Sequence, residues 1–209
     1  MSRNLKVLGL IFIAVLAMSA AMAPVSQASQ YTCSAYPCTV TGSNTKGSET
    51  FTTPGGTVQC DSHYQGTLSE ASSSLKITPK YSNCSAFGFL NAEIHFIGCW
   101  IVSHITVSLG GGRYLHIYDI ECEAGAVIII TAATCEVKIP AQAGLTSTET
   151  ENLAGGTLTV KPNISGITMN VTKDGFGCPF SGTGHTKGSF HGDVTLSRIG
   201  GGSISASGS

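Results

Sequence analysis

Three acidic residues alternate near the middle of the 209-residue chain and are its clearest candidates for chemistry. On an extended strand, Asp119, Glu121 and Glu123 would share one face at a spacing of roughly 6 to 7 Å. Two carboxyl groups at such a separation can act as the pair of a glycosidase, and several carboxylates together can bind calcium. No neighbouring residue marks one carboxyl as buried and protonated, which a general acid needs. A solvated strand edge that resists aggregation is the more common use of this pattern.

The only tryptophan of the chain lies near these carboxylates if the preceding segment is the partner strand. Trp100 would then be opposite Glu121, and His104 would be diagonal to Asp119. An exposed indole ring can stack on a sugar while carboxylates bond the sugar hydroxyls. The candidate ligand-binding set is therefore Trp100, His104, Asp119 and Glu121. The alternative is that the ring packs under a loop or a second sheet, because burial of its large apolar area is favourable.

A β-hairpin would position this set. The segment CWIVSHITVSLGGGRYLHIYDIEC, residues 99–122, has two arms rich in Ile, Val, Tyr and Thr, which favours strands over 100–109 and 113–122. A two-residue turn at Gly110 and Gly111 would pair residues whose numbers sum to 221, because glycine accepts positive φ without steric cost.

This register sorts the side chains by polarity. One face is mostly apolar and consists of Cys99, Ile101, Ser103, Ile105, Val107, Tyr114, His116, Tyr118, Ile120 and Cys122. The other face receives every charged side chain and consists of Trp100, Val102, His104, Thr106, Ser108, Arg113, Leu115, Ile117, Asp119 and Glu121. A slip by one residue would turn Asp119 and Glu121 toward the apolar side, which burial of unpaired carboxylates penalises. We expect His116 to make hydrogen bonds in the core.

Eight cysteines in an exported chain predict four disulfides, because oxidising compartments keep thiols paired. They are Cys33, Cys38, Cys60, Cys84, Cys99, Cys122, Cys135 and Cys178. The hairpin register favours a bond between Cys99 and Cys122. A competing scheme closes two local loops of ~15 residues, Cys84 with Cys99 and Cys122 with Cys135, each contributing about 3 kcal/mol. The remaining predictions are a small Cys33–Cys38 loop around Pro37 and a long-range bond between Cys60 and Cys178.

Motifs for known chemistry are missing from the sequence. It contains no Gly-x-Ser-x-Gly elbow, His-Glu-x-x-His helix, phosphate-binding glycine loop or EF-hand spacing. Cys60 and His63 could begin a zinc site, but no second closely spaced pair supports one. We therefore predict no catalytic residue, no metal and no cofactor.

The first 28 residues are typical of a secretory signal peptide. Arg3 and Lys6 precede an apolar run to about residue 23, and Ser26 and Ala28 supply the small side chains of a cleavage site. Removing this leader leaves nine basic and twelve acidic residues, a net charge of −3, which argues against nucleic acid as a partner. No second apolar segment is long enough to span a membrane. We expect a secreted β-domain over 29–199 and a disordered Gly/Ser tail over 200–209.

The rest of the chain is rich in short, turn-bounded strand patterns. They cover Thr57–Tyr64, Leu75–Tyr81, Ala92–Ile97, Val127–Thr131, Cys135–Ile139, Thr157–Lys161, Ile164–Thr172 and Phe190–Arg198. The best helical pattern is the short stretch Thr148–Leu153, which could equally be a loop. The pattern predicts an all-β fold, namely a single antiparallel sandwich or barrel-like domain stapled by disulfides.

Three segments carry a resemblance to a known group of proteins. YSNCSAFGFLNAEIHFIGC, ATCEVKIPAQ and VTKDGFGCPFSGTG resemble small secreted, cysteine-containing β-proteins of the high-GC Gram-positive, actinobacterial type that have no assigned activity. The resemblance covers most of the mature chain and six cysteines, while Cys33 and Cys38 look like an addition. It implies secretion and a β-fold, and no activity.

Two functional hypotheses follow from these observations. The preferred one is a secreted, non-enzymatic binding or structural module, for which a glycan or another cell-envelope component is the partner class considered. The alternative is an extracellular glycan hydrolase that uses Asp119 and Glu121.

Overall fold

The structure is a computed structural model and describes residues 29–110, 113–150, 152–154, 156–176, 178–180 and 182–207. The predicted leader and the predicted turn residue Gly111 lie outside these ranges. The described part of the chain is all-β, antiparallel and crosslinked by four disulfides, which confirms the predicted fold class. No helix occurs in it, and therefore none that is long and apolar enough to cross a membrane.

The strands are β1 (Gln30–Cys33), β2 (Cys38–Asn44), β3 (Thr50–Thr53), β4 (Gly56–Leu68), β5 (Ser74–Ala86), β6 (Leu90–His95), β7 (Cys99–Gly110), β8 (Arg113–Cys122), β9 (Ile128–Ala132), β10 (Cys135–Ile139), β11 (Gln142–Thr150), β12 (Asn152–Ala154), β13 (Thr157–Val160), β14 (Asn163–Asp174), β15 (Gly184–His191), β16 (Val194–Arg198) and β17 (Ile204–Ser207).

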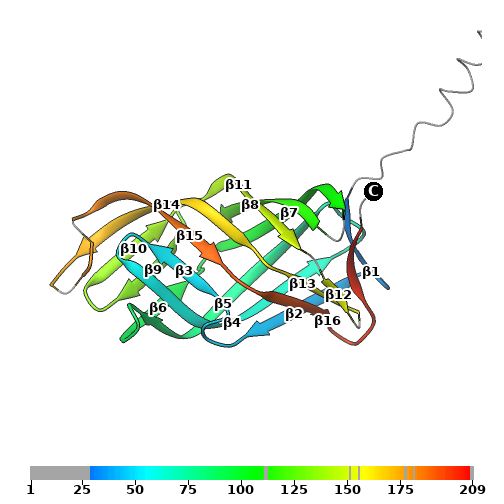
Figure 1. The fold of residues 1–209 in the computed structure, drawn as a ribbon, viewed down its shortest axis with the longest axis horizontal. Helices are drawn as coiled ribbons and strands as arrows, with labels where there is room; N and C mark the ends of the chain where they lie inside the picture. The colour runs from blue at the N-terminus through cyan, green and yellow to red at the C-terminus, as the bar shows by residue number, and fades with distance from the viewer. Residues whose placement is uncertain are drawn as a thin grey trace, which may run out of the picture.

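Eight of the strands close into a barrel. The ring runs β5, β6, β9, β10, β14, β15, β3 and β4 and returns to β5, and it occupies the left half of Figure 1. Buried side chains of the ring and of the neighbouring β7, β8 and β11 form the barrel core: Val58, Cys60, Cys84, Ala86, Ala92, Cys99, Tyr118, Ile120, Ile128, Ile130, Ala132, Val137, Ile139, Leu145, Ile164, Ile167, Met169 and Val171. An eight-stranded barrel has an interior just wide enough for side chains or for one small ligand.

Two groups of strands extend from the barrel toward the right of Figure 1. β7, β8 and β11 continue from β5, while β2, β16, β13 and β12 continue from β4. Together with the β1–β17 pair they form the second core: Tyr31, Cys38, Val40, Tyr64, Leu68, Leu75, Ile105, Leu158, Val160, Val194, Leu196, Ile204 and Ala206. The long strands β4 and β5 belong to both halves. In β4 every second residue from Val58 to Leu68 is buried, as the two-residue period of a strand requires.

The predicted hairpin is formed by β7 and β8. Its register is confirmed over seven consecutive pairs, from Cys99 opposite Cys122 onward. Two bulges toward the hairpin end then shift the pairing, so that Gly110 pairs with Arg113. The prediction of Gly110 as a turn residue is therefore wrong. The first bulge also reverses the alternation, which is why Val107, predicted on the apolar face, is 49% exposed.

The disulfides confirm two of the predicted pairs, Cys33–Cys38 and Cys99–Cys122. The predicted Cys60–Cys178 bond is wrong, as is the competing scheme of local loops. Cys60 bonds Cys84 because β4 and β5 are neighbours in the barrel, which brings the two Cα atoms to 4.0 Å. Cys135 bonds Cys178 because β10 pairs with β14, whose end lies just before Cys178.

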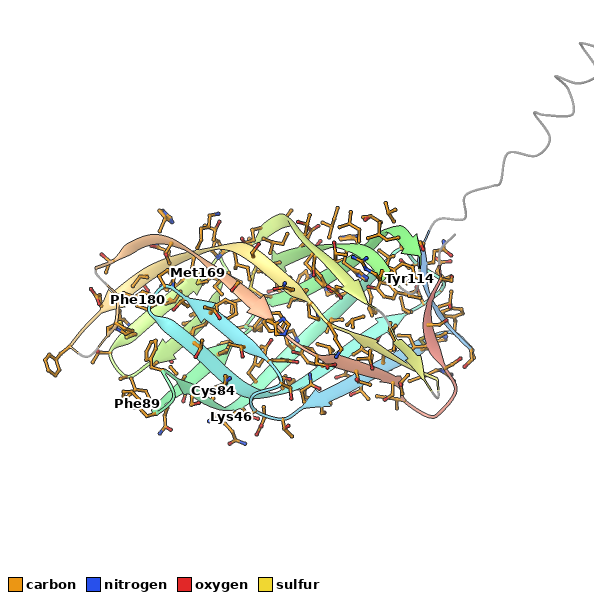
Figure 2. All side chains as sticks on the ribbon, in the orientation of Figure 1. Lys46, Cys84, Phe89, Tyr114, Met169 and Phe180 are labelled. Carbon is orange, nitrogen blue, oxygen red and sulfur yellow. A yellow bond between two sulfur atoms is a disulfide. The ribbon has the colours of Figure 1, made fainter. Side chains whose placement is uncertain are left out.

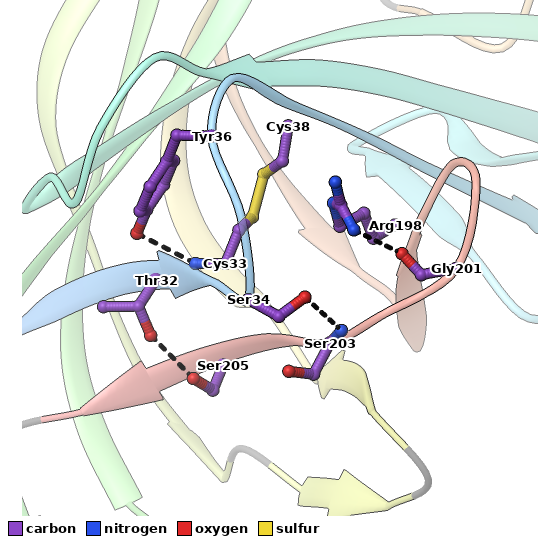
Figure 3. The surroundings of a disulfide bond; sticks show 9 residues. All are labelled: Thr32, Cys33, Ser34, Tyr36, Cys38, Arg198, Gly201, Ser203 and Ser205. Atoms are coloured by element: carbon purple, nitrogen blue, oxygen red, sulfur yellow. Dashed lines mark hydrogen bonds between the residues drawn. A yellow bond between two sulfur atoms is a disulfide. The ribbon is translucent and has the colours of Figure 1, made fainter.

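The prediction of a disordered tail over 200–209 is also wrong. Its residues 204–207 form β17, which pairs with β1. Ile204 is fully buried and Ala206 is 4% exposed, so the segment contributes to the second core. The loop before it is held by the amide of Ser203, which donates to Ser34 Oγ at 3.1 Å (Figure 3). Two apolar side chains suffice here because β1 supplies the missing backbone partners.

Two smaller expectations are corrected by strand pairing. Of the stretch Thr148–Leu153, the described residues 148–150 and 152–153 are strand rather than helix or loop, because β11 continues through Thr150 and β12 begins at Asn152. β11 pairs with β8 and buries alternate residues, among them Glu149. The single strand predicted over Phe190–Arg198 is two strands, β15 and β16.

Candidate functional site

The four residues predicted from the sequence do lie together on the outer face of the β7–β8 hairpin. The Trp100 indole Nε1 donates a hydrogen bond to Glu121 Oε2 at 2.7 Å. His104 Nε2 lies 3.3 Å from Asp119 Oδ2. Both contacts follow from the register, which places Trp100 opposite Glu121 and His104 diagonal to Asp119, two residues beyond its partner Val102.

Protein partners already occupy this surface. Lys76, on the neighbouring strand β5, places its ammonium 3.3 Å from the centre of the Trp100 ring, a cation–π contact. Asp119 Oδ1 accepts a hydrogen bond from the Gly144 amide at 2.8 Å. One ring face and the indole donor are thus taken, which leaves a poor platform for stacking a sugar.

The alternating carboxylates do not gather into a metal centre. Asp119 is half-buried, whereas Glu121 and Glu123 are exposed. Across the residues that the structure describes, no three His, Cys, Asp or Glu side chains lie close enough together to hold a metal ion. The hydrolase hypothesis for Asp119 and Glu121 gains no feature of a buried general acid from this geometry.

A second and different candidate lies inside the molecule. An internal cavity of about 110 Å³ is lined mostly by apolar side chains of both cores. Ile128 and Ile130 contribute from the barrel core, and Leu158 contributes from the second core. Ile77 and Ile101, cross-strand partners on β5 and β7, line it where the two cores meet. Figure 2 shows how the side chains fill the space between the strands.

One wall of the cavity carries a carboxyl group. Glu49, which lies just before β3, is 3% exposed and lines the cavity. Its Oε1 accepts a hydrogen bond from Asn44 Nδ2 at 2.5 Å, and its Oε2 accepts one from the Tyr64 hydroxyl. The Tyr81 ring packs edge-on against Tyr64, with 6.5 Å between the ring centres. Burial raises the pKa of Glu49 above its ordinary value and raises the pKa of both tyrosines.

Another part of the wall belongs to a buried hydrogen-bond network. The Tyr31 hydroxyl, Ser103 Oγ and His116 Nδ1 lie within 2.8 to 3.3 Å of one another. The His116 ring stacks on Tyr118, whose hydroxyl donates to Glu149 Oε1 at 2.5 Å. The prediction that His116 makes core hydrogen bonds is confirmed. Because Tyr31 bonds both Ser103 and His116, and all three are nearly inaccessible to solvent, we assign this network a structural role.

An open polar groove of about 690 Å³ lies on the outside of the barrel, along β5, β6 and β9. Its lining includes Asn83, Asn91, Glu93, His95 and Thr131. Glu93 and His95 contact each other at 3.0 Å. The groove therefore offers amide, carboxylate, imidazole and hydroxyl groups within one depression.

Sequence reasoning missed the cavity residues Glu49, Tyr64 and Tyr81. The alternation of β4 indicated that Tyr64 faces inward, because Cys60 and Leu68 share its parity. Nothing local indicated the burial of Glu49, which follows a polar turn and meets Tyr64 only in the folded protein.

The fold and the cavity together define a disulfide-crosslinked, all-β protein built on a closed antiparallel barrel. Comparison with protein-family models finds no match for the chain, and comparisons with curated proteins and with solved structures find none either.

Proposed function

We propose that the protein is a secreted, non-enzymatic binding protein that holds a small apolar ligand in its internal cavity. The observation that carries the proposal is the cavity itself, which is lined mainly by Ile, Leu, Val and Phe side chains. Empty cavities with such linings stay dry and take up apolar molecules, and one of about 150 Å³ binds benzene. By that measure this cavity suits a ligand of about four to five heavy atoms.

The disulfides and the predicted leader support the extracellular part of the proposal. All eight cysteines are paired in disulfides, and such bonds persist in oxidising compartments. The N-terminal segment has the charge and apolar run of a signal peptide.

Titration of the purified, oxidised protein with 1-butanol tests the proposal, with binding followed by NMR shifts of isoleucine methyl groups. We expect shifts at Ile77, Ile101 and Ile130 and not at exposed Ile97. Ile101→Phe should fill the cavity and weaken binding at least about ten-fold, since a bulkier ring takes the place of the ligand. Val107→Phe is the matched control, because Val107 lies on the same strand and is exposed. The proposal would be contradicted if butanol caused no saturable shifts in the wild-type protein. It would also be contradicted if the shifts were unchanged in Ile101→Phe.

The polar groove favours a second candidate, the binding of a glycan of the cell envelope. Asn83, Asn91, Glu93 and His95 offer the planar polar groups that bond sugar hydroxyls. A glycan array, probed with the protein and with Asn91→Ala, tests this candidate. Binding lost in Asn91→Ala supports the groove, and binding lost in Trp100→Ala instead would place the ligand on the hairpin surface.

A further inference from the structure

Glu49 is an ionisable group placed at the wall of an otherwise apolar cavity. Its position is fixed from two sides. It follows the turn after β2, and the connection between β15 and β16 packs against it at Gly192. A Cβ atom at Gly192 would lie 3.1 Å from Glu49 Cγ, so the glycine provides room for the glutamate.

The groups that surround the carboxyl are neutral. Asn44 and Tyr64 donate to its two oxygens, and the buried Ser62 is a further neutral neighbour. Tyr64 comes from β4, and Asn44 from the end of β2. The hydrogen bonds from Asn44 and Tyr64 hold the side chain without supplying a positive charge.

No cation balances Glu49 within the part of the chain that the structure describes. The described ion pairs join other carboxylates to lysine or histidine, and the influences on the Glu49 pKa are burial and neutral hydrogen bonds. A buried carboxylate is ordinarily paired, because an isolated charge in an apolar setting is costly. The cavity thus contains one carboxyl group that has no cationic partner among the described residues around it.

Resting on the proposed function, we propose that the ligand is a small apolar primary amine whose ammonium group binds Glu49 and whose hydrocarbon part fills the cavity between the two cores. Folding has already removed the carboxylate from water, so the ligand meets a group that is desolvated and oriented in advance. The ammonium then forms a charge-assisted hydrogen bond, which is roughly twice as strong as a neutral one. The isoleucines and leucines of the wall bury the remaining carbon atoms.

Glu149 provides a matched comparison within the same chain. It is 1% exposed, and it accepts a hydrogen bond from the hydroxyl of Tyr118, as Glu49 does from Tyr64. Glu149 is not among the described residues that line the cavity. Replacing it removes a buried carboxyl from a similar environment without changing the cavity wall.

The experiment compares n-butylamine with 1-butanol, which have the same number of heavy atoms, by calorimetric and NMR titration of the oxidised protein. We expect the amine to bind wild-type protein at least about ten-fold more tightly. Glu49→Gln should abolish this preference and leave butanol affinity within about two-fold. Glu149→Gln should keep the preference.

The outcomes separate this inference from the proposed function. Butanol binding without an amine preference in the wild-type protein overturns the amine assignment and leaves the cavity as a binding site. An amine preference that persists in Glu49→Gln overturns the role of Glu49. Absence of binding by both compounds overturns both proposals. The wild-type comparison needs no variant and therefore decides the question even if Glu49→Gln does not fold.

Discussion

The two halves of the molecule are stabilised by different means. The barrel strands are crosslinked by Cys60–Cys84 and Cys135–Cys178, which close sequence separations of 24 and 43 residues. The Cys99–Cys122 bond of the β7–β8 hairpin packs against the barrel core and closes 23 residues. The second core has one disulfide, which closes only five residues, and it contains the Tyr31–Ser103–His116 network. The cavity is lined by side chains of both cores, so both halves forgo some packing contacts. Covalent links at the barrel core and polar links in the second core are two ways of keeping a defined structure.

Removing disulfides should give the largest effects and should separate the two halves. In a chain-entropy treatment, loss of Cys135–Cys178 as a double serine variant lowers the free energy of unfolding by about 4 kcal/mol, and loss of Cys33–Cys38 lowers it by about 2 kcal/mol. The difference follows from the separations of 43 and 5 residues. Urea unfolding measures both. Equal losses would remove the distinction between a covalently held barrel and a second core held by packing.

Shortening a buried side chain of β17 tests how far the stability of the second core depends on this strand. Ile204→Ala should lower the free energy of unfolding by about 3 kcal/mol, because a fully buried side chain leaves a cavity. Ile199→Ala is the control, since Ile199 is 53% exposed, and it should change stability by less than about 0.5 kcal/mol. Thermal and urea unfolding give both values. Equal changes in the two variants would show that Ile204 does not stabilise the second core.

The buried network offers a smaller and more specific test. Tyr31→Phe keeps the ring and removes the hydroxyl that bonds Ser103 and His116. We expect a loss of about 1 to 2 kcal/mol, because the two remaining groups stay buried. Tyr36→Phe removes a partly exposed hydroxyl that bonds the Cys33 amide (Figure 3) and should lose about 0.5 kcal/mol. A neutral Tyr31→Phe would mean that the network does not stabilise the second core.

The smallest effects concern pH, and here two glutamates have opposite signs. The pKa of Glu49 is raised by burial, so its contribution to stability falls as pH rises from its ordinary value of 4.5 toward the raised one. Hydrogen bonds to Lys173 and Thr172 lower the pKa of Glu136, on β10, to about 2. Its contribution is present above pH 4.5 and is lost as pH falls toward about 2.

Glu49→Gln and Glu136→Gln separate these two contributions. The free energy of unfolding should no longer decline above pH 4.5 because of residue 49 in Glu49→Gln. In Glu136→Gln it should decline less as pH falls below 4.5. Identical pH profiles for both variants and wild type would show that neither carboxyl changes its affinity for protons on folding.

The sequence predicted local pairing well. The β7–β8 register was predicted from a glycine turn and from the alternation of apolar residues, and it correctly placed Trp100 beside Glu121 although the turn begins after Gly110. It could not predict the bulges, because Val107 is as apolar as the residues that stay inside. Nor could it predict that Lys76 covers the indole ring, since β5 becomes the neighbour of β7 only in the assembled sheet.

Features that depend on distant partners were out of reach for the same reason. Cys60 and Cys84 are brought together by the pairing of β4 with β5. The buried Glu49 and Glu149 interrupt the apolar pattern that marks an inward face, so neither signalled its burial. β17 has only two buried apolar residues, Ile204 and Ala206, and its stability depends on β1 at the other end of the described chain.

The sharing of β4 and β5 by both halves has a consequence for how the molecule comes apart. Each of these strands is 13 residues long and contributes side chains to both cores. Neither half can therefore melt while the other keeps its full complement of strands, and the protein is expected to lose its structure in one cooperative step rather than lobe by lobe.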